Sequence, residues 1–212
     1  MCSGRVDLEF IFRAFLKWQD GVFIGGCKLD ECNYVTHGNY DAFAITFMGK
    51  KILEHLGLNP KRLRTEFMSG ADGNLLAEYT DDFSHQIKEL GPLGKSEGMD
   101  AGLVKFKLEA ARKLIPYIRL VERERLRVPV KSKQAYTEFF ESNEVNALFD
   151  EILSDKLAIS QILLLLGEKP LSTSDISEQL GLNPSDVSRY MIRSSRHGMV
   201  RYDTASRCYA RT

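Results

Sequence analysis

A short apolar run followed by two glycines and two cysteines constrains this chain more than any other stretch. Residues 23–33 are Phe-Ile-Gly-Gly-Cys-Lys-Leu-Asp-Glu-Cys-Asn, so Cys27 and Cys32 come just after a predicted strand over Val22–Ile24. We expect that strand to be buried and to end at the two glycines. In open α/β sheets, ligands bind beyond the carboxyl ends of the strands. The sequence therefore predicts that both cysteines lie at a ligand-binding edge.

A third cysteine, Cys2, stands close to Gly4, so three of the four cysteines fall within the first 32 residues. Thiolates are soft ligands suited to iron–sulfur clusters, copper(I) or zinc. Three thiolates are one short of the usual four for an iron–sulfur cluster. Cys208 belongs to another predicted domain, and His37 fits a local hydrogen-bonding role, so neither is assigned as a ligand. The alternative is that these are ordinary buried cysteines.

Composition excludes some classes of partner and location. Lys+Arg and Asp+Glu both total 29, so net charge does not favour nucleic acid or an anionic membrane. The longest apolar run, Ile162–Leu166, is far too short to span a bilayer. No basic segment precedes an apolar one at the start, so we expect no secretory signal and a cytoplasmic location. Disulfides are then unlikely, which favours metal or redox chemistry for the clustered cysteines.

The first part of the chain, residues 1–95, alternates helix and strand patterns. Helices are predicted over residues 7–18, 39–56 and 71–90, and strands over 22–24 and 62–67, with Leu75 and Leu76 of the third helix facing inward. This order predicts an α/β fold, a partial doubly wound, flavodoxin-like half-domain. Two strands make a sheet too small to bury three helices. We therefore expect that a partner chain or further residues supply the missing strands.

The remainder divides into a helical linker region, residues 96–154, and a C-terminal module, residues 155–212. Residues 91–98 have the composition of a linker. Helices are predicted over 101–127, with Leu103 on the buried side, and over 135–153. In the module, a helix ending at Gly167 is followed by two helices capped near Ser172 and Asn183, and then by a hairpin. This order predicts a winged helix-turn-helix.

Arginine is concentrated near the C-terminus. Between Arg189 and the end of the chain there are six arginines and one acidic residue, Asp203. Arginines on a recognition helix can contact phosphate or guanine. The alternatives are a basic surface that docks onto protein, or a solvated helix face, because helix-turn-helix shapes serve both.

The first part of the chain resembles a known family. The start Met-Cys-Ser-Gly-Arg-Val-Asp, then Asp-Gly-Val-Phe-Ile-Gly-Gly-Cys-x4-Cys-x-Tyr and Gly-Asn-Tyr, resemble the methyl-viologen-reducing hydrogenase delta subunit over roughly residues 1–95. The resemblance implies one 2Fe-2S cluster, with Cys2, Cys27 and Cys32 as its ligands and no catalytic residue. In that family a further segment with a strand and a Cys-x-x-Cys element precedes the counterpart of Met1. The sequence shows no such segment, and three explanations stay open: a start assigned too late, a missing half that is a separate polypeptide, or loss of the cluster.

The resemblance also implies a function. Members carry electrons between a hydrogenase or formate dehydrogenase and the heterodisulfide reductase A-type flavoprotein, in anaerobic oxidoreductase complexes of methanogenesis. An iron-sulfur electron-transfer subunit is thus expected, with no membrane partner and with nucleic acid unlikely. Lys28, beside the cluster, would favour its reduced and more negative state. Two alternatives stay open: a redox-sensing DNA-binding regulator and a metal-free structural adaptor.

Overall fold

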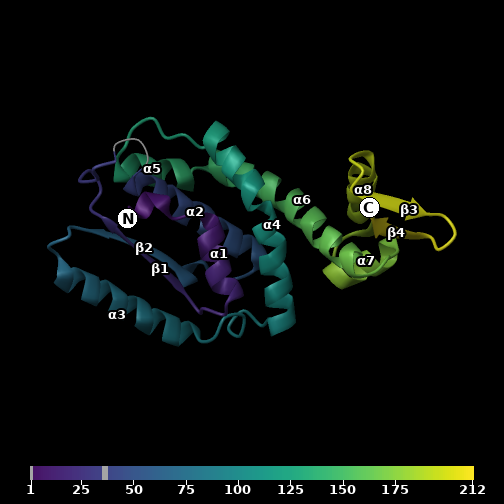
Figure 1. The fold of residues 1–212 in the computed structure, drawn as a ribbon, viewed down its shortest axis with the longest axis horizontal. Coiled ribbons are helices and arrows are strands. Elements are labelled where there is room, and N and C mark those ends of the chain that lie inside the picture. The colour runs from purple at the N-terminus through teal and green to yellow at the C-terminus, as the bar shows by residue number, and fades with distance from the viewer. Residues whose placement is uncertain (1, 35–37) are drawn as a thin grey trace. The chain divides into compact units, whose positions relative to one another are not determined.

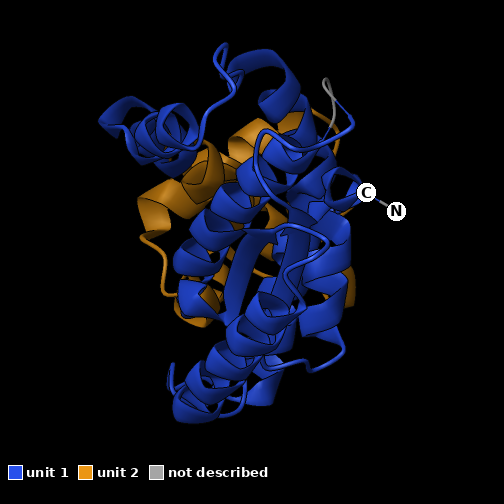
Figure 2. Cartoon of the chain, turned by 90° about the vertical axis from the view of Figure 1, so that its left-hand side faces the viewer, with its two compact units in different colours: residues 1–150 blue, residues 151–212 orange. Residues whose placement is uncertain are grey.

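The computed structural model describes residues 2–34 and 38–212, so His37 lies outside the described residues. The chain forms two compact units, residues 1–150 and residues 151–212 (Figure 2). Both mix helices with a small two-stranded sheet, and helix dominates. Within the described ranges, no helix combines the length and the apolar character needed to cross a membrane.

The first unit contains a parallel pair of strands and most of the helices. A 3₁₀ turn, Ser3–Arg5, comes first, and a second, Pro60–Arg62, precedes the second strand. The other elements are α1 (Leu8–Leu16), β1 (Val22–Cys27), α2 (Asn39–Leu56), β2 (Leu63–Met68), α3 (Gly73–Leu90), α4 (Ala101–Arg125) and α5 (Lys133–Glu141).

The sheet is the middle layer of the first unit. Strands β1 and β2 run parallel and are connected by α2. Successive side chains of a strand point to opposite faces. Phe67 of β2 packs on Phe43 of α2, whereas Phe23 of β1 packs on Phe83 of α3. Helix α2 therefore covers one face of the sheet and α3 the other (Figure 1).

Strand β1 is longer than the sequence indicates. We predicted an end at Gly25 and Gly26, but pairing continues until Cys27 lies opposite Met68. The prediction was wrong because glycine weakens a strand only locally, and here the neighbouring strand supplies hydrogen-bond partners along its whole length. Cys27 is consequently the last residue of the ladder rather than part of a free loop.

The inward faces predicted for two helices need correction. Leu75 and Leu76 of α3 are 37% and 45% exposed, and Phe83 is the buried residue of this helix. In α4 the buried side begins at Val104, whereas Leu103 is 40% exposed. Periodicity shows that a helix has an apolar stripe, but the partner element decides which part of it is covered. Here two strands are too narrow to cover the whole of α3.

The helix predicted over 135–153 is two helices. Helix α5 ends at Glu141, and α6 (Asn143–Glu168) starts after Ser142, whose hydroxyl accepts from the Val145 N–H at 3.3 Å. Helix α5 is attached to α2 through stacked aromatic rings, with the Phe47 and Phe140 centroids 5.3 Å apart. Helix α6 continues past Gly167, the predicted stop, and the boundary between the units lies within it.

The segment 91–98, predicted to be a linker, is held against the first unit. Arg62, with no exposed side-chain surface, donates to the carboxylate of Glu97 at 2.7 Å and to the carbonyls of Gly91 and Pro92. The Leu93 N–H donates to Asp20 at 2.7 Å. A composition typical of loops therefore conceals an ordered segment, because its partners lie far away in the sequence.

The second unit contains the C-terminal part of α6, then α7 (Thr173–Leu180), α8 (Pro184–Arg196), β3 (Val200–Asp203) and β4 (Cys208–Arg211). Ser172 and Asp175 form a reciprocal capping box at α7. Asn183 caps α8, and Pro184 occupies its first turn. Ten buried residues of this unit form one apolar cluster: Ala158, Ile159, Ile162, Leu166, Leu171, Ile176, Val187, Tyr190, Met191 and Val200.

Candidate metal centre

The structure brings the three N-terminal cysteines together. Cys2 caps the first 3₁₀ turn, where its sulfur accepts from the Gly4 N–H at 3.4 Å. Cys27 ends β1, and Cys32 lies in the loop that leads to α2. The Sγ atoms of Cys2 and Cys32 are 3.8 Å apart, and the Cys27 thiol interacts electrostatically with both. Cys208 belongs to the second unit, where its thiol donates to the Ser206 carbonyl.

The sulfur–sulfur distance is informative. Two thiolates on one tetrahedral metal with bonds of about 2.3 Å are separated by roughly 3.7–3.8 Å. Cys2 and Cys32 already have this separation as free thiols. Among the described residues, however, no three His, Cys, Asp or Glu side chains converge on one point suited to a metal ion. The arrangement is a thiol pair with a third thiol beside it.

The backbone around Cys32 favours its anionic form. Hydrogen bonds from the backbone of Tyr34 and, more weakly, of Asn39 lower the pKa of the Cys32 thiol. Asn39 is the first residue of α2, and a helix N-terminus offers free N–H groups and positive potential. Burial and the neighbouring Cys32 thiol instead raise the pKa of Cys27. Of these two thiols, Cys32 is therefore the one more readily converted to a thiolate.

The side chain of Asn39 holds the Cys27 turn in place. This buried amide donates to the carbonyls of Cys27 at 2.9 Å and Lys28 at 2.8 Å, and its nitrogen is 3.6 Å from the Cys27 sulfur. From the sequence, Asn39 is predicted only as the start of a helix. The Gly-Asn-Tyr motif was the available signal, but the function of its amide depends on residues 11 and 12 positions away.

Two further contacts anchor the loop between Cys27 and Cys32. The Tyr40 hydroxyl donates to Asp30 at 2.6 Å, and burial together with this bond raises the pKa of Tyr40. Asp30 has a φ of 72°, in the left-handed region, so the backbone of this loop takes a specific turn conformation at Asp30. Lys28, predicted to favour a reduced cluster, forms an exposed ion pair with Glu31 at 3.4 Å. Its charge is partly offset there.

Glycines let backbone approach the cysteines closely. A Cβ at Gly38 would lie 2.7 Å from the Cys32 sulfur and 2.4 Å from the Tyr34 carbonyl oxygen. One at Gly4 would lie 2.3 Å from the Gly38 carbonyl oxygen. At Gly25, by contrast, a Cβ would meet nothing closer than 3.7 Å. Gly38 therefore lets the backbone approach the Cys32 sulfur closely, and Gly4 lets the first 3₁₀ turn approach Gly38.

A hollow of about 370 Å³ opens beside Cys2 and Cys27. Its walls include Cys2, Ser3, Gly26 and Cys27 on one side and the segment from Met68 to Gly73 on the other. The Ser3 hydroxyl is buried and has no hydrogen-bond partner among the described residues. Three features together fit a sulfur-rich inorganic group. They are the cysteine thiols, the close backbone approach at Gly4 and Gly38, and the buried Ser3 hydroxyl, which has no partner in the part of the chain that the structure describes.

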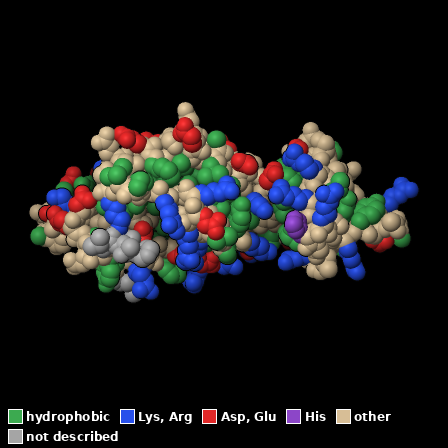
Figure 3. All heavy atoms as spheres, turned by 90° about the horizontal axis from the view of Figure 1, so that it is seen from above, with side chains coloured by type: hydrophobic (Ala, Val, Ile, Leu, Met, Phe, Trp, Pro, Cys, Tyr) green, Lys and Arg blue, Asp and Glu red, His purple; other side chains and the backbone are tan. Residues whose placement is uncertain are grey.

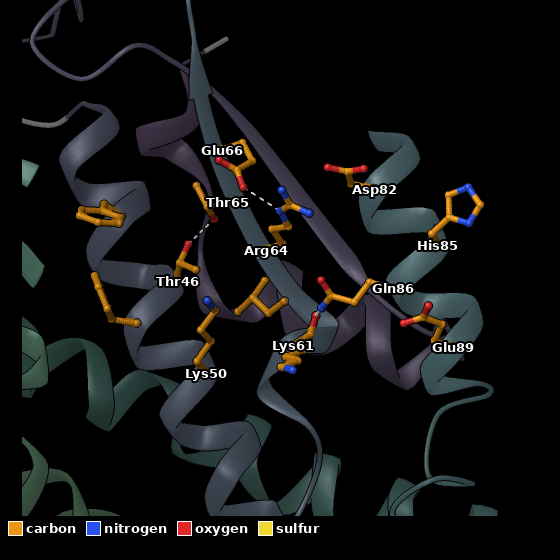
Figure 4. A pocket seen from close by; sticks show the side chains of 13 residues that line it. Thr46, Lys50, Lys61, Arg64, Thr65, Glu66, Asp82, His85, Gln86 and Glu89 are labelled. Atoms are coloured by element: carbon orange, nitrogen blue, oxygen red, sulfur yellow. Dashed lines mark hydrogen bonds and ion pairs between the residues drawn. The ribbon is translucent and has the colours of Figure 1, made fainter. Parts of the chain in front are cut away.

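A larger hollow, about 680 Å³, lies along β2 between α2 and α3 (Figure 4). Some of its polar side chains pair with one another: the hydroxyls of Thr46 and Thr65 are hydrogen-bonded, and Arg64 contacts Glu66 at 2.7 Å. Gln86 of α3 donates to the Lys61 carbonyl at 2.7 Å. It contains no cysteine, so the thiol site and not this hollow is the candidate for redox chemistry.

The second unit has a basic face on α8. Arg189, Arg193, Arg196 and His197 line a shallow hollow there, and basic side chains surround a histidine on the surface of this unit (Figure 3). Arg189 and Arg193 also lie 3.8 and 3.6 Å from the carboxylate of Asp155. The positive charge of this face is thus partly neutralised within the unit.

Comparison with known proteins gives two family matches. The sequence profile of the family described as methyl-viologen-reducing hydrogenase, delta subunit, matches residues 1–91. The profile described as bacterial regulatory protein, arsR family, matches residues 160–191. The first match contains all three cysteines of the thiol site, and the second ends within α8.

Individual relatives match the same N-terminal region. The vhu iron-sulfur subunit of the F420-non-reducing hydrogenase of Methanococcus maripaludis is 41% identical over 91 residues, which are 43% of this chain and 67% of that protein. The corresponding iron-sulfur subunit from Archaeoglobus profundus is 44% identical over 91 residues, 43% of this chain and 66% of that protein. The A-type subunit of the ferredoxin:CoB-CoM heterodisulfide reductase of Methanosarcina mazei is 42% identical over 94 residues, 44% of this chain but only 12% of that protein.

Proposed function

The chain belongs to the methyl-viologen-reducing hydrogenase delta subunit family, and we propose that it is an iron–sulfur electron-transfer subunit. The observation that carries this proposal is the 3.8 Å separation of the Cys2 and Cys32 sulfurs, with Cys27 beside them. These residues are 30 positions apart, so a chance arrangement of unrelated thiols is a poor explanation. The hydrogenase relatives are named as iron-sulfur subunits, which supports the same group.

Cys2, Cys27 and Cys32 are the proposed ligands of a 2Fe-2S cluster. When bound, such a cluster takes up and releases one electron at a time without making or breaking a bond in a substrate. The backbone N–H groups of Tyr34 and Asn39 stabilise the Cys32 thiolate, and Asn39 positions Cys27. Such a cluster usually has four protein ligands, so one more ligand is needed besides these three thiols.

The proposed partners follow from the relatives. One set of relatives is named as hydrogenase subunits and the other as the A-type subunit of heterodisulfide reductase, within which the matching segment is a small part. We propose that this chain transfers electrons between a hydrogenase or a formate dehydrogenase and an A-type flavoprotein of heterodisulfide reductase. The N-terminal half would be a partial flavodoxin-like domain that contacts both.

The decisive experiment is to measure iron and acid-labile sulfide in the anaerobically purified chain and in its native complex, with an EPR spectrum after reduction. We expect about two irons, two sulfides and a reduced-cluster signal in the complex. A signal in the isolated chain as well would mean that a fourth ligand is within its own reach. Iron absent from both samples would contradict the proposal and favour a metal-free adaptor.

A second function, binding of duplex DNA by the second unit as a winged helix-turn-helix, is favoured by the arsR-family match to residues 160–191. The basic face of α8 supports it, while the contacts of Arg189 and Arg193 with Asp155 weaken it. Phosphate contacts make DNA affinity fall steeply with salt.

The test is fluorescence anisotropy of the full chain with duplex DNA at several salt concentrations. Arg196→Glu should reduce affinity and flatten the salt dependence if α8 contacts phosphate. Arg5→Glu, an equal charge change at an exposed position of the first unit, is the matched control. Equal affinities for the two variants would contradict DNA binding through α8.

A further inference from the structure

Resting on the proposed function, we propose that the Ser3 hydroxyl donates a hydrogen bond to a sulfur of the bound cluster or of its thiolate ligands, and so raises the reduction potential. Ser3 is the residue after Cys2 and begins the first 3₁₀ turn. It is a positioning and tuning residue, not a ligand.

The Ser3 hydroxyl is a buried polar group. The Ser3 oxygen is inaccessible to water and has no hydrogen-bond partner among the described residues. Leaving a buried hydroxyl unpaired costs about 1–3 kcal/mol, so native proteins rarely do so without a reason. A group absent from the free chain but present in the working protein would remove this cost.

The Ser3 hydroxyl also lies close to two of the proposed ligands. Ser3 lines the hollow that Cys2 and Cys27 also line. Its oxygen packs against Gly26, where a Cβ would lie only 2.8 Å away, so any larger residue there would displace it. Gly26 directly precedes Cys27 in β1. The hydroxyl thus lies against the backbone that leads into Cys27, in the wall of a hollow that two proposed ligands also line.

A hydrogen bond from Ser3 would raise the reduction potential of the cluster rather than lower it. Reduction adds negative charge to the sulfurs, and a hydrogen-bond donor stabilises that charge. Lys28, which follows Cys27 in the sequence, is exposed and paired with Glu31, so it is a weak source of stabilisation. A buried neutral donor acts without screening by solvent. Removing it should therefore make the cluster harder to reduce.

The test compares two serine-to-alanine variants of the full chain in its native complex. Ser3→Ala should lower the ratio of reduced to oxidised cluster at least tenfold at a fixed potential, a shift of about 59 mV for a one-electron couple. Ser194→Ala is the matched control, because its hydroxyl is also buried and without a partner among the described residues, but lies in the second unit. It should leave the potential unchanged.

A spectroscopic readout separates tuning from a merely structural role. Pulsed ENDOR of the reduced wild-type cluster should show a proton coupling that disappears in D₂O, and Ser3→Ala should lack that coupling. The cluster-free Ser3→Ala chain should unfold at a temperature no lower than wild type, since no hydrogen bond of the free chain is lost.

The outcomes distinguish this inference from the function on which it rests. Wild-type complex without iron would overturn both. Iron in wild type and in Ser3→Ala, with equal potentials and the same exchangeable proton, would overturn the role of Ser3 alone. A lower potential together with loss of that proton in Ser3→Ala, but not in Ser194→Ala, is the expected result.

Discussion

The sulfurs of Cys2 and Cys32 lie 3.8 Å apart although 30 residues separate them in the sequence. Cys2 is positioned by the 3₁₀ turn of residues 3–5, and Cys32 by the approach to α2. That turn packs on α2, so the distance between the thiols depends on the packing of two elements. The pair is the basis of the first prediction.

Each of the variants Cys2→Ser, Cys27→Ser and Cys32→Ser should lose most of the bound iron. A hydroxyl is a much poorer ligand than a thiolate for the iron of such a cluster. Iron per chain in the purified complex is the measurement. Cys208→Ser is the control and should keep wild-type iron, since this thiol belongs to the second unit. Equal iron in Cys32→Ser and Cys208→Ser would refute the ligand assignment.

Gly38→Ala should release iron while the rest of the first unit stays folded. Its φ of −128° is open to any residue, so the conflict is steric: the added Cβ would lie 2.7 Å from the Cys32 sulfur. We expect a faster loss of the cluster's absorbance in the presence of a chelator. Gly70→Ala, in the wall of the hollow but with open space around it, should behave like wild type. The idea fails if both variants lose iron at the same rate.

Asn39→Ala should loosen the Cys27 turn. The substitution removes donors to two carbonyls, at a cost of about 1–3 kcal/mol in the free energy of unfolding. Hydrogen exchange at the amides of residues 27–32 should accelerate more than elsewhere in the first unit. Asn33→Ala, at an exposed position of the same loop, is the control. Unchanged exchange in Asn39→Ala would mean that the amide bonds are not what holds the turn.

Glu97 should make stability depend on pH in the acid range. Burial alone would raise the pKa of Glu97, but hydrogen bonds from Arg62, the Asn59 N–H and Ser96 outweigh it and lower the pKa to about 2. Because the folded value lies below the ordinary value of 4.5, stability is complete above about pH 4.5 and declines as pH falls towards 2. The shift corresponds to about 3 kcal/mol.

Urea unfolding of wild type and Glu97→Gln between pH 2 and 7 measures this contribution. The variant should be less stable by about 3 kcal/mol at pH 7, since one partner of a buried ion pair is lost, and its difference from wild type should shrink as pH falls from 4.5 towards 2. Glu54→Gln removes the exposed pair with Lys51 and should cost less than about 1 kcal/mol. Parallel curves for wild type and Glu97→Gln would exclude Glu97 as the titrating group.

Local signals explain what could be predicted. Asp100, Ser172 and Asn183 cap the helices that follow them, and Gly57 and Gly181 end helices in the left-handed conformation. Each effect acts within one turn of helix, so a short stretch of sequence contains all of it. The hairpin predicted after these helices is also present, with Val200–Asp203 paired antiparallel to Cys208–Arg211.

Interactions between residues that are far apart in the sequence could not be predicted. Arg62 and Glu97 are 35 positions apart, and nothing near either residue indicates that the segment between 91 and 98 is ordered. The exposed Leu75 and Leu76 show the same limit, because the extent of burial depends on the width of the sheet and not on α3 itself.

By itself, the sequence determined which residue types could hold a metal, where most of the helices begin and end, and the family to which the chain belongs. Only the tertiary structure decided that the Cys2 and Cys32 sulfurs meet, that the Asn39 amide holds Cys27, and that the Ser3 hydroxyl is buried without a partner among the described residues. The physical reason is that propensity and capping act over a few residues. Packing instead joins residues from distant elements, and its geometry exists only once those elements are in contact.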